Sequence, residues 1–288
     1  MPYGTDVIYS YDGSFEGLMC CVFVGYSEKE LPSEIIAGEP EQLTLSPVRT
    51  ICTDPEQSRR ILASIPLKMG DGAMDFIRKA FLTCHPQKDL LILKLMYMGY
   101  KHGGRIFQNL SNNVVNELNK AILHCSNEAH HLKGFIRFSD TGNALTAEIE
   151  PKNCVLPLIA DHFIDRYRNE NFLIYDKKHR MALIYADGVP ELLTDIEIQL
   201  PDYSAEELYF RELWKTFYDS IGIKERFNPR CRMNLMPKRY WSNMPEMQDE
   251  IYRPQNAPRP SGLSSLGTAP LKCENGINEN PLLSINSD

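Results

Sequence analysis

Residues 133–151, KGFIRFSDTGNALTAEIEP, decide the fold class, because the hydrophobic period changes here from that of a helix to that of a strand. Apolar and polar side chains alternate over 133–140 and over 144–151, as they do in half-buried strands. The residues between them, TGN at 141–143, favour a tight turn. The stretch predicts an antiparallel hairpin, with Lys133, Phe135 and Arg137 on one face.

The sequence that follows this hairpin predicts one helix and two more strands. Residues 153–167, NCVLPLIADHFIDRY, have helical spacing. FLIYDKKH at 172–179 and MALIYADG at 181–188 have the composition of short strands about a turn. We therefore expect a β-β-α-β-β unit within a β-rich subdomain at 133–200.

The sequence before the hairpin is mostly helical. Apolar spacing predicts helices over 55–65, 72–85, 87–101 and from Ser111 or Asn112 to Leu132. These would form a helical subdomain at 54–132. The chain begins with a strand, a turn at Asp12 and Gly13, and a helix capped by Ser14. An irregular connection with two short β-like pieces, LTL at 43–45 and VRTICT at 48–53, is expected over 31–54. The fold class is therefore α+β, with antiparallel hairpins after a helical N-terminal half.

The C-terminal part is predicted to be a helix, a basic segment and a tail. Residues 204–223 form an amphipathic pattern that starts with a capping box, Ser204 and Glu207. Residues 251–288 are rich in Pro, Ser, Gly and Asn and predict a flexible, low-complexity tail. Residues 1–250 are expected to be a single domain.

Composition is that of an ordinary globular protein, with 43% hydrophobic and 24% charged residues. The N-terminus has no secretion pattern, and no apolar run reaches 18 residues, so we expect a cytoplasmic protein without membrane contact. The eight cysteines include no CxxC pair, and we expect them to be reduced.

A local concentration of positive charge stands out in a chain whose net charge is −7. The segment 224–241, KERFNPRCRMNLMPKRYW, holds six cations and one acidic residue. Arg and Lys bind phosphate oxygens, and Tyr240 and Trp241 offer flat faces to an unpaired base. The nucleic-acid contacts expected in this segment are Lys224, Arg226, Asn228, Arg230, Arg232, Lys238, Arg239, Tyr240 and Trp241. The alternative is a surface loop whose cations pair with acidic residues, while Tyr240 and Trp241 close the core.

Two other stretches are weaker candidates. The turn Tyr11, Asp12, Gly13 and Ser14 follows a strand and opens a helix, where backbone N–H groups could hold an anion. A turn capped by Ser14 explains it equally well.

The second stretch combines histidines and cations around the hairpin. Lys133, Arg137 and Arg166 would extend a phosphate track. His162 lies four residues before Arg166, so both share a helix face. His131 and His162 are weak candidates for an acid or base, and with His130 and Cys154 they lack a metal-ligand spacing. We expect no metal and no cofactor.

Several blocks together resemble a bacterial family of DNA metabolism proteins whose biochemical activity is unknown. The blocks are YDGSFEGLMCCVF at 11–23, EAHHLKGFIRFSD at 128–140, EIEPKNCVLPLIADHFIDRY at 148–167 and FYDSIGIKERFNPRCRMNLMPKRYWSNMPEM at 217–247. The resemblance covers about residues 5 to 250. It implies a DNA-repair setting, because members are encoded beside a radical-SAM protein of DNA modification or repair and are sometimes fused to a uracil-DNA-glycosylase-like domain. It supplies no catalytic residue.

The expected function is therefore DNA binding in repair or base modification, with damaged or locally single-stranded DNA and the radical-SAM protein as partners. One alternative is a nucleic-acid-processing enzyme, hydrolase or glycosylase-like, that uses His162 or His131. A second alternative is a non-catalytic scaffold subunit whose helices dock the partner enzyme.

Overall fold

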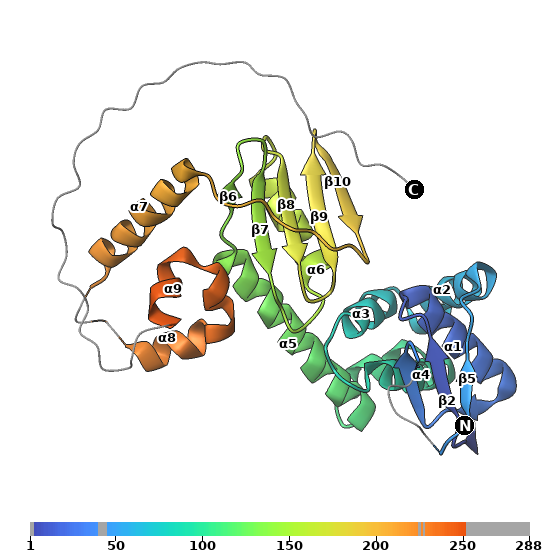
Figure 1. Cartoon of the computed structure of the whole chain (residues 1–288). Coiled ribbons are helices and arrows are strands. Elements are labelled where there is room, and N and C mark those ends of the chain that lie inside the picture. The colour runs from blue at the N-terminus through green and yellow to red at the C-terminus, as the bar shows by residue number, and fades with distance from the viewer. Residues whose placement is uncertain (1–2, 40–44, 224–225, 227, 252–288) are drawn as a thin grey trace, which may run out of the picture. The chain divides into compact units, whose positions relative to one another are not determined.

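The computed structural model describes residues 3–39, 45–223, 226 and 228–251 (Figure 1). It is a mixed α+β structure, as predicted. All of these residues lie within one unit, Met1–Tyr252. Lys224 and residues 252–288 of the predicted tail lie outside the described residues.

Three parallel strands near the N-terminus begin the first hydrophobic core (Figure 1). β2 (Ile8–Tyr11) lies between β4 (Glu34–Ala37) and β5 (Val48–Thr50). β1 (Tyr3–Gly4) pairs separately with β3 (Glu30–Leu31). Of the two β-like pieces expected in the irregular connection 31–54, VRTICT at 48–53 contains β5, and LTL at 43–45 lies mostly outside the described residues. β4 was not expected, so the connection is more regular than predicted.

Helices complete the first core. They are α1 (Phe15–Glu28), α2 (Pro55–Met69), α3 (Gly72–Phe81), α4 (Lys88–His102) and the 3-10 turn η1 (Gly103–Gln108). Ser14 caps α1 by accepting a hydrogen bond from the N–H of Gly17, as predicted. α4 buries residues on most of its circumference, including the consecutive Leu90 to Leu93, so it is the central helix of this core.

The long helix α5 (Asn113–Phe135) belongs to both cores. Its N-terminal half places Val115 and Leu118 in the first core. Its C-terminal half places Cys125 and Leu132 in the second. Asn112 is the N-cap and accepts hydrogen bonds from Val114 N and Val115 N, which decides between the two predicted caps.

The second core is built on a five-stranded sheet of order β10-β9-β8-β7-β6. Its elements are β6 (Ser139–Asp140), β7 (Leu145–Ile149), α6 (Leu156–Arg166), β8 (Phe172–Asp176), β9 (Met181–Ala186) and β10 (Val189–Leu193). β7 and β8 are parallel, and α6 lies between them in the sequence; the other neighbours are antiparallel. β10 is an edge strand that the sequence did not predict.

The strand expected over 133–140 is shorter than predicted. α5 continues through Phe135, and pairing with β7 starts only at Ser139. The helix persists because Leu132 is buried and Phe135 packs against the second core, and residues three apart share one helix face. Lys133 is therefore helical and does not share a strand face with Arg137.

Four short or amphipathic elements end the described chain. They are α7 (Ala205–Ile221), α8 (Pro229–Leu235), η3 (Lys238–Asn243) and α9 (Pro245–Ile251). Ser204 caps α7 through the N–H of Glu207. α7 packs on α9 (Figure 1), and Met244 and Met247 enter the second core. No helix in the described part of the chain has the length and apolar character to cross a bilayer.

Candidate functional site

The predicted basic segment forms α8, η3 and the residues around them. Arg226, Arg230 and Lys238 are exposed. Asn228 caps α8 by accepting a hydrogen bond from Cys231 N at 3.0 Å. Asn228 thus has a structural partner, whereas the three cations are exposed to solvent.

The ring of Trp241 contacts two of the cations, Arg232 and Lys238. The Arg232 guanidinium lies 5.1 Å and the Lys238 ammonium 5.7 Å from the centre of its ring. Both distances are within the range of a cation–π contact. Arg232 and Lys238 are therefore held near each other by one aromatic ring.

Tyr240 and Trp241 are not available to stack on a base. Their exposed fractions are 4% and 3%. Trp241 donates its indole N–H to the carbonyl of Met236 at 3.0 Å, and Tyr240 packs against Phe135. Both rings close the second core, as the alternative interpretation of this segment expects.

Arg239 has an internal partner in Glu128 of α5. Its Nη2 lies 3.1 Å from Glu128 Oε1, and the Glu128 side chain is 1% exposed. Burial alone would raise the pKa of Glu128, but hydrogen bonds from the backbone of Asn153 and Lys152 and from the side chains of Asn153 and Tyr240 outweigh it, so the pKa lies below its usual value. This ionised carboxylate neutralises Arg239.

Arg137 also has an internal partner. Its Nε and Nη2 donate to Glu246 Oε1 at 3.0 and 2.7 Å, and its guanidinium lies 5.7 Å from the centre of the Trp214 ring. Trp214 donates its indole N–H to the other oxygen of Glu246 at 3.0 Å. The group joins the segment after α5 to α7 and α9.

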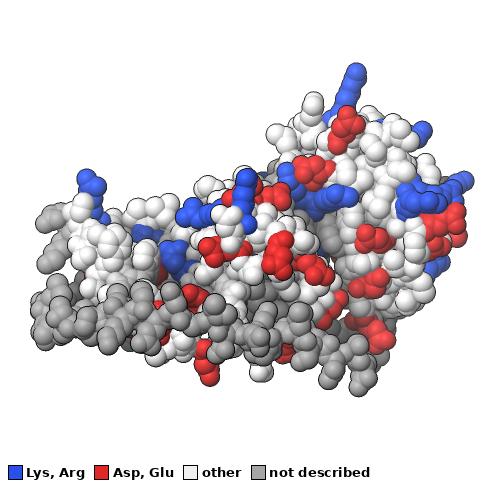
Figure 2. All heavy atoms as spheres, turned by 90° about the horizontal axis from the view of Figure 1, so that it is seen from above, with Lys and Arg blue, Asp and Glu red and all other residues white. Residues whose placement is uncertain are grey.

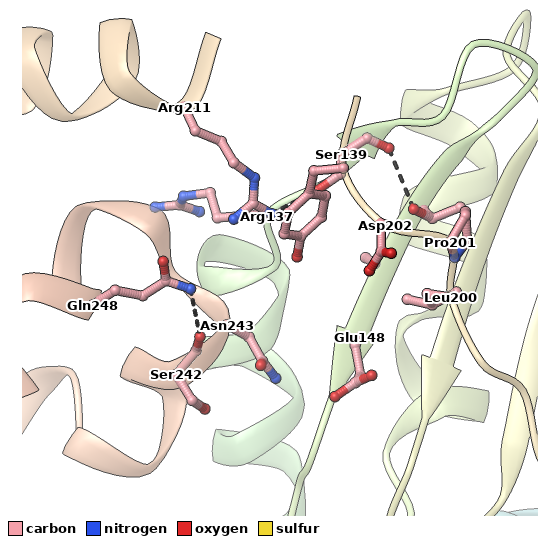
Figure 3. Close-up of a pocket in the computed structure, with 13 residues that line it drawn as sticks. Arg137, Ser139, Glu148, Leu200, Pro201, Asp202, Arg211, Ser242, Asn243 and Gln248 are labelled. Carbon is pink, nitrogen blue, oxygen red and sulfur yellow. Dashed lines mark hydrogen bonds between the residues drawn. The ribbon is translucent and has the colours of Figure 1, made fainter. Parts of the chain in front are cut away.

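A pocket of about 260 Å³ lies next to this group (Figure 3). Arg211 of α7 forms part of its wall and donates to Glu207 at 2.9 Å and to Ser139 Oγ at 2.7 Å. Its lining residues are Arg137, Ser139, Thr146, Ala147, Glu148, Leu200, Pro201, Asp202, Tyr203, Arg211, Ser242, Asn243 and Gln248. Because two arginines and two carboxylates line it, the pocket is polar without strong positive charge.

Lys133 of α5 and Arg166 of α6 form a separate cationic group beside His162, which we call the Lys133 group. Burial lowers the pKa of His162, and the positive charges of Lys133 and Arg166 lower it further. His162 is therefore neutral at neutral pH. His131 lies on another side of α5, against the Phe135 ring, so the structure does not bring the two histidines together as an acid–base pair.

The turn Tyr11–Ser14 already contains an anion. Asp12 accepts hydrogen bonds from Ser14 N, Ser14 Oγ and Thr53 Oγ1. Burial opposes ionisation, but these bonds outweigh it and lower the pKa of Asp12. Tyr11 is 3% exposed. The Asp12 carboxylate occupies the start of α1, so we leave this turn out of the candidate site.

The described surface shows no broad area of one sign from the direction of Figure 2, where acidic and basic residues are interspersed. Within residues 3–39, 45–223, 226 and 228–251, no three His, Cys, Asp or Glu side chains are placed to hold a metal ion. Within the described residues, at least partly exposed cations outside internal pairs occur at α8 and its flanks, at Lys133 and Arg166 of the Lys133 group, and also elsewhere, as at Arg59 and Lys68 of α2.

Sequence reasoning missed the buried carboxylates Glu128, Glu207 and Glu246. Glu207 carried a signal as a capping residue, yet its carboxylate binds Arg211 and the backbone N–H of Asp140. Glu128 and Glu246 lie more than 100 residues from their arginine partners, and a single sequence shows no such pairing.

Comparison with known proteins identifies a family. Residues 86–246 match the model of a domain of unknown function, DUF4130. The matched region extends from the start of α4 into α9, and it includes α8 and every pocket residue except Gln248. No curated protein and no solved structure matches the chain. Because the match covers more than half of the sequence, the chain belongs to the family of the domain of unknown function DUF4130.

Proposed function

We propose that this protein binds DNA through the cations of α8 and its flanks, and that it acts in DNA repair or base modification with a radical-SAM enzyme. The repair setting and the partner come from the family resemblance in the sequence. The DNA-binding part has its own support in the charges of the folded chain.

The observation that carries the proposal is the uncompensated charge of Arg226, Arg230 and Lys238, which lie in the stretch from Arg226 to Pro245. No Asp or Glu occurs in this stretch of sequence. In the described part of the chain, no carboxylate lies at ion-pair distance from Arg226, Arg230 or Lys238. A surface with several cations and no carboxylate attracts a polyanion by releasing its counterions.

The mode of binding follows from which residues are exposed. Arg and Lys side chains contact phosphates, whereas Tyr240 and Trp241 are buried and read no base. We therefore expect binding that depends weakly on base sequence and strongly on salt. Lys133 and Arg166 supply further phosphate contacts in this proposal.

The experiment compares two charge-matched variants. Arg230→Ala with Lys238→Ala removes two proposed contacts, and Arg59→Ala with Lys68→Ala removes two exposed cations of α2, outside the family match. Fluorescence anisotropy with labelled single-stranded and duplex oligonucleotides gives the affinity of each. We expect the first variant to bind about tenfold more weakly and the second to bind like wild type. Equal affinity of all three proteins would reject the proposed surface.

The partner is tested separately. Co-expression with a radical-SAM enzyme of the kind encoded beside members of the resembled family should produce a modified nucleoside in DNA that mass spectrometry detects. The modification should be lost when this chain is omitted. A modification that forms equally well without this chain would reject the joint function, and it would leave the DNA-binding test unaffected.

A further inference from the structure

The pocket beside Arg137 and Arg211 contains polar groups that the fold leaves without partners. Its volume is about 260 Å³, slightly below the range of pockets that hold drug-sized molecules. The strands β6 and β7, the segment before α7, and the helices α7, η3 and α9 all contribute side chains to its wall. The pocket therefore has room for a small ligand, which several elements would contact.

The two arginines of the wall are neutralised by carboxylates that do not line the pocket. Arg137 donates to Glu246, and Arg211 donates to Glu207. Both of these carboxylates are buried, and neither belongs to the lining. Because the positive charge of the wall is already compensated, a ligand does not need to bring a negative charge.

The two carboxylates of the wall, Glu148 and Asp202, are less well paired. Glu148 Oε1 lies 3.5 Å from Lys177 Nζ, in a pair that solvent reaches. Asp202 is exposed and forms no ion pair in the described part of the chain. Two carboxylates in one small site accept hydrogen bonds and repel an anion. The pocket therefore favours a ligand with N–H donors over a phosphate group.

Asn243 and Gln248 add hydrogen-bonding groups on another wall. Gln248 donates its side-chain N–H to the carbonyl of Ser242 at 3.0 Å. The side-chain amide of Asn243 has no hydrogen-bond partner among the described residues, so it offers both donors and an acceptor. Figure 3 shows Asn243 and Gln248 on the side of η3 and α9, across from Glu148 and Asp202. A ligand in the pocket meets acceptors on one side and an amide on the other.

Tyr203 supplies an aromatic surface. The Arg211 guanidinium lies 3.7 Å from the centre of its ring, at the distance of a stacked cation–π contact. Arg211 is itself anchored to Glu207 and Ser139, so it holds the ring from one side. Tyr203 is 49% exposed, and the free face of an aromatic ring stacks on a planar ligand.

We propose that the pocket binds a nucleobase that carries an amino group, such as cytosine; that the base comes from a bound DNA strand rests on the proposed function. The amino group donates to Glu148 or Asp202, an acceptor of the base takes a hydrogen bond from Asn243, and the ring stacks on Tyr203. Thymine has a carbonyl oxygen where cytosine has its amino group. The two carboxylates repel this oxygen, so the pocket discriminates against thymine.

η3 connects the pocket to the proposed phosphate contacts. Lys238 begins this 3-10 helix and Asn243 ends it, and five residues of such a helix rise by about 10 Å. A strand whose phosphate contacts Lys238 therefore passes near the pocket. The base must be unpaired to enter, and most of the affinity still comes from phosphates. We expect a modest base preference of about fivefold.

Free nucleosides test the pocket without any phosphate. Titrations of the full chain with deoxycytidine and with thymidine, followed by ligand-observed NMR, should show that deoxycytidine binds about fivefold or more tightly than thymidine. Agmatine, a small guanidinium cation, is the third ligand. Equal binding of the two nucleosides, binding of neither, or binding of agmatine without deoxycytidine overturns the proposal.

Two variants with the same loss of charge test the role of the carboxylates. Glu148→Gln with Asp202→Asn should weaken deoxycytidine binding at least fivefold and remove the preference over thymidine. The control is Glu150→Gln with Glu197→Gln. Both control residues are exposed and outside the lining, and Glu150 lies 3.6 Å from the same Lys177 that Glu148 contacts.

The control should keep the preference of wild type. Circular dichroism verifies that both variants are folded, as expected because neither Glu148 nor Asp202 belongs to a buried pair. A pocket variant that keeps the preference, or a control that loses it equally, overturns the proposal.

Homopolymers test whether the base belongs to a bound strand. Strands of deoxycytidine and of thymidine with equal length carry the same phosphates, so a difference in their affinity reports on the base alone. Fluorescence anisotropy should show that wild type prefers the deoxycytidine strand about fivefold and that the pocket variant binds both strands alike. Equal affinity of wild type for both strands would reject a bound strand as the source of the base. Because free nucleosides carry no phosphate, their result is independent of the α8 cations, and failure of either proposal is recognised separately.

Discussion

Arg137 and Glu246 are 109 residues apart in the sequence, and their side chains form a salt bridge of 2.7 Å. Glu246 is buried and also accepts the indole N–H of Trp214. This carboxylate therefore connects the segment after α5 with α7 and α9. A polar network closes the second core on this side, and we expect the stability of the C-terminal helices to depend on it.

Replacing Glu246 by Ala should destabilise the protein by about 3 kcal/mol, because it leaves the partly buried Arg137 without its carboxylate. Glu212→Ala is the control, since Glu212 forms an exposed pair with Lys215, and it should change stability by less than about 1 kcal/mol. Urea unfolding followed by circular dichroism measures both. Similar losses in the two variants would show that the Arg137 pair is not structural.

Glu128 should make stability depend on acid pH. Its folded pKa lies below the unfolded value of 4.5, so the unfolded state binds more protons as pH falls toward that value. The stabilisation is complete above pH 4.5 and is lost as pH falls through the folded pKa. Urea unfolding between pH 3 and 7 should show this loss in wild type and a smaller one in Glu128→Gln. An identical pH dependence in both proteins would exclude Glu128 as its source.

Two glycines should respond to alanine with opposite signs. A Cβ at Gly104 would lie 2.3 Å from the backbone carbonyl oxygen of Met69, whereas a Cβ at Gly134 in α5 meets nothing within 4 Å. Gly104→Ala should therefore lower the melting temperature through a clash with backbone. Gly134→Ala should raise stability by about 0.5–1 kcal/mol through helix propensity. Thermal unfolding checks both, and a stabilised Gly104→Ala would contradict the packing of η1 on α2.

The two tryptophans should differ in their access to solvent. Trp241 is 3% and Trp214 39% exposed. In Trp214→Phe, the fluorescence of Trp241 should resist quenching by acrylamide, and in Trp241→Phe the fluorescence of Trp214 should be readily quenched. Strong quenching of Trp241 would restore it as a candidate for stacking on a base.

Local signals in the sequence predicted local structure well. Ser14, Asn112 and Ser204 cap their helices because a side-chain oxygen near an N–H two or three positions later needs no long-range contact. The parallel sheet around β2 was missed for the opposite reason. β4 is only four residues long. It pairs with β2 from beyond α1, and no local pattern in the sequence reveals such a long-range pairing.

The sequence predicted where the cations of the candidate site lie, but not which of them form ion pairs with carboxylates. The exposed Arg226, Arg230 and Lys238 lie in the segment that charge alone marked. Arg239 and Arg137 belong to internal pairs, and their partners are carboxylates from distant segments. A run of cations in a sequence does not show which of them are exposed and which are paired. Only the fold brings Glu128 to Arg239 and Glu246 to Arg137.

The salt dependence of DNA binding tests the central claim most directly. Anisotropy titrations of wild type with a labelled single strand, between 50 and 200 mM salt, should give a linear fall of log affinity with log salt, at about 0.7 per phosphate contact. Arg230→Ala with Lys238→Ala should make this slope shallower by about 1.4, while Arg59→Ala with Lys68→Ala leaves it unchanged. Equal slopes in all three proteins, or no binding at 50 mM salt, would contradict the account.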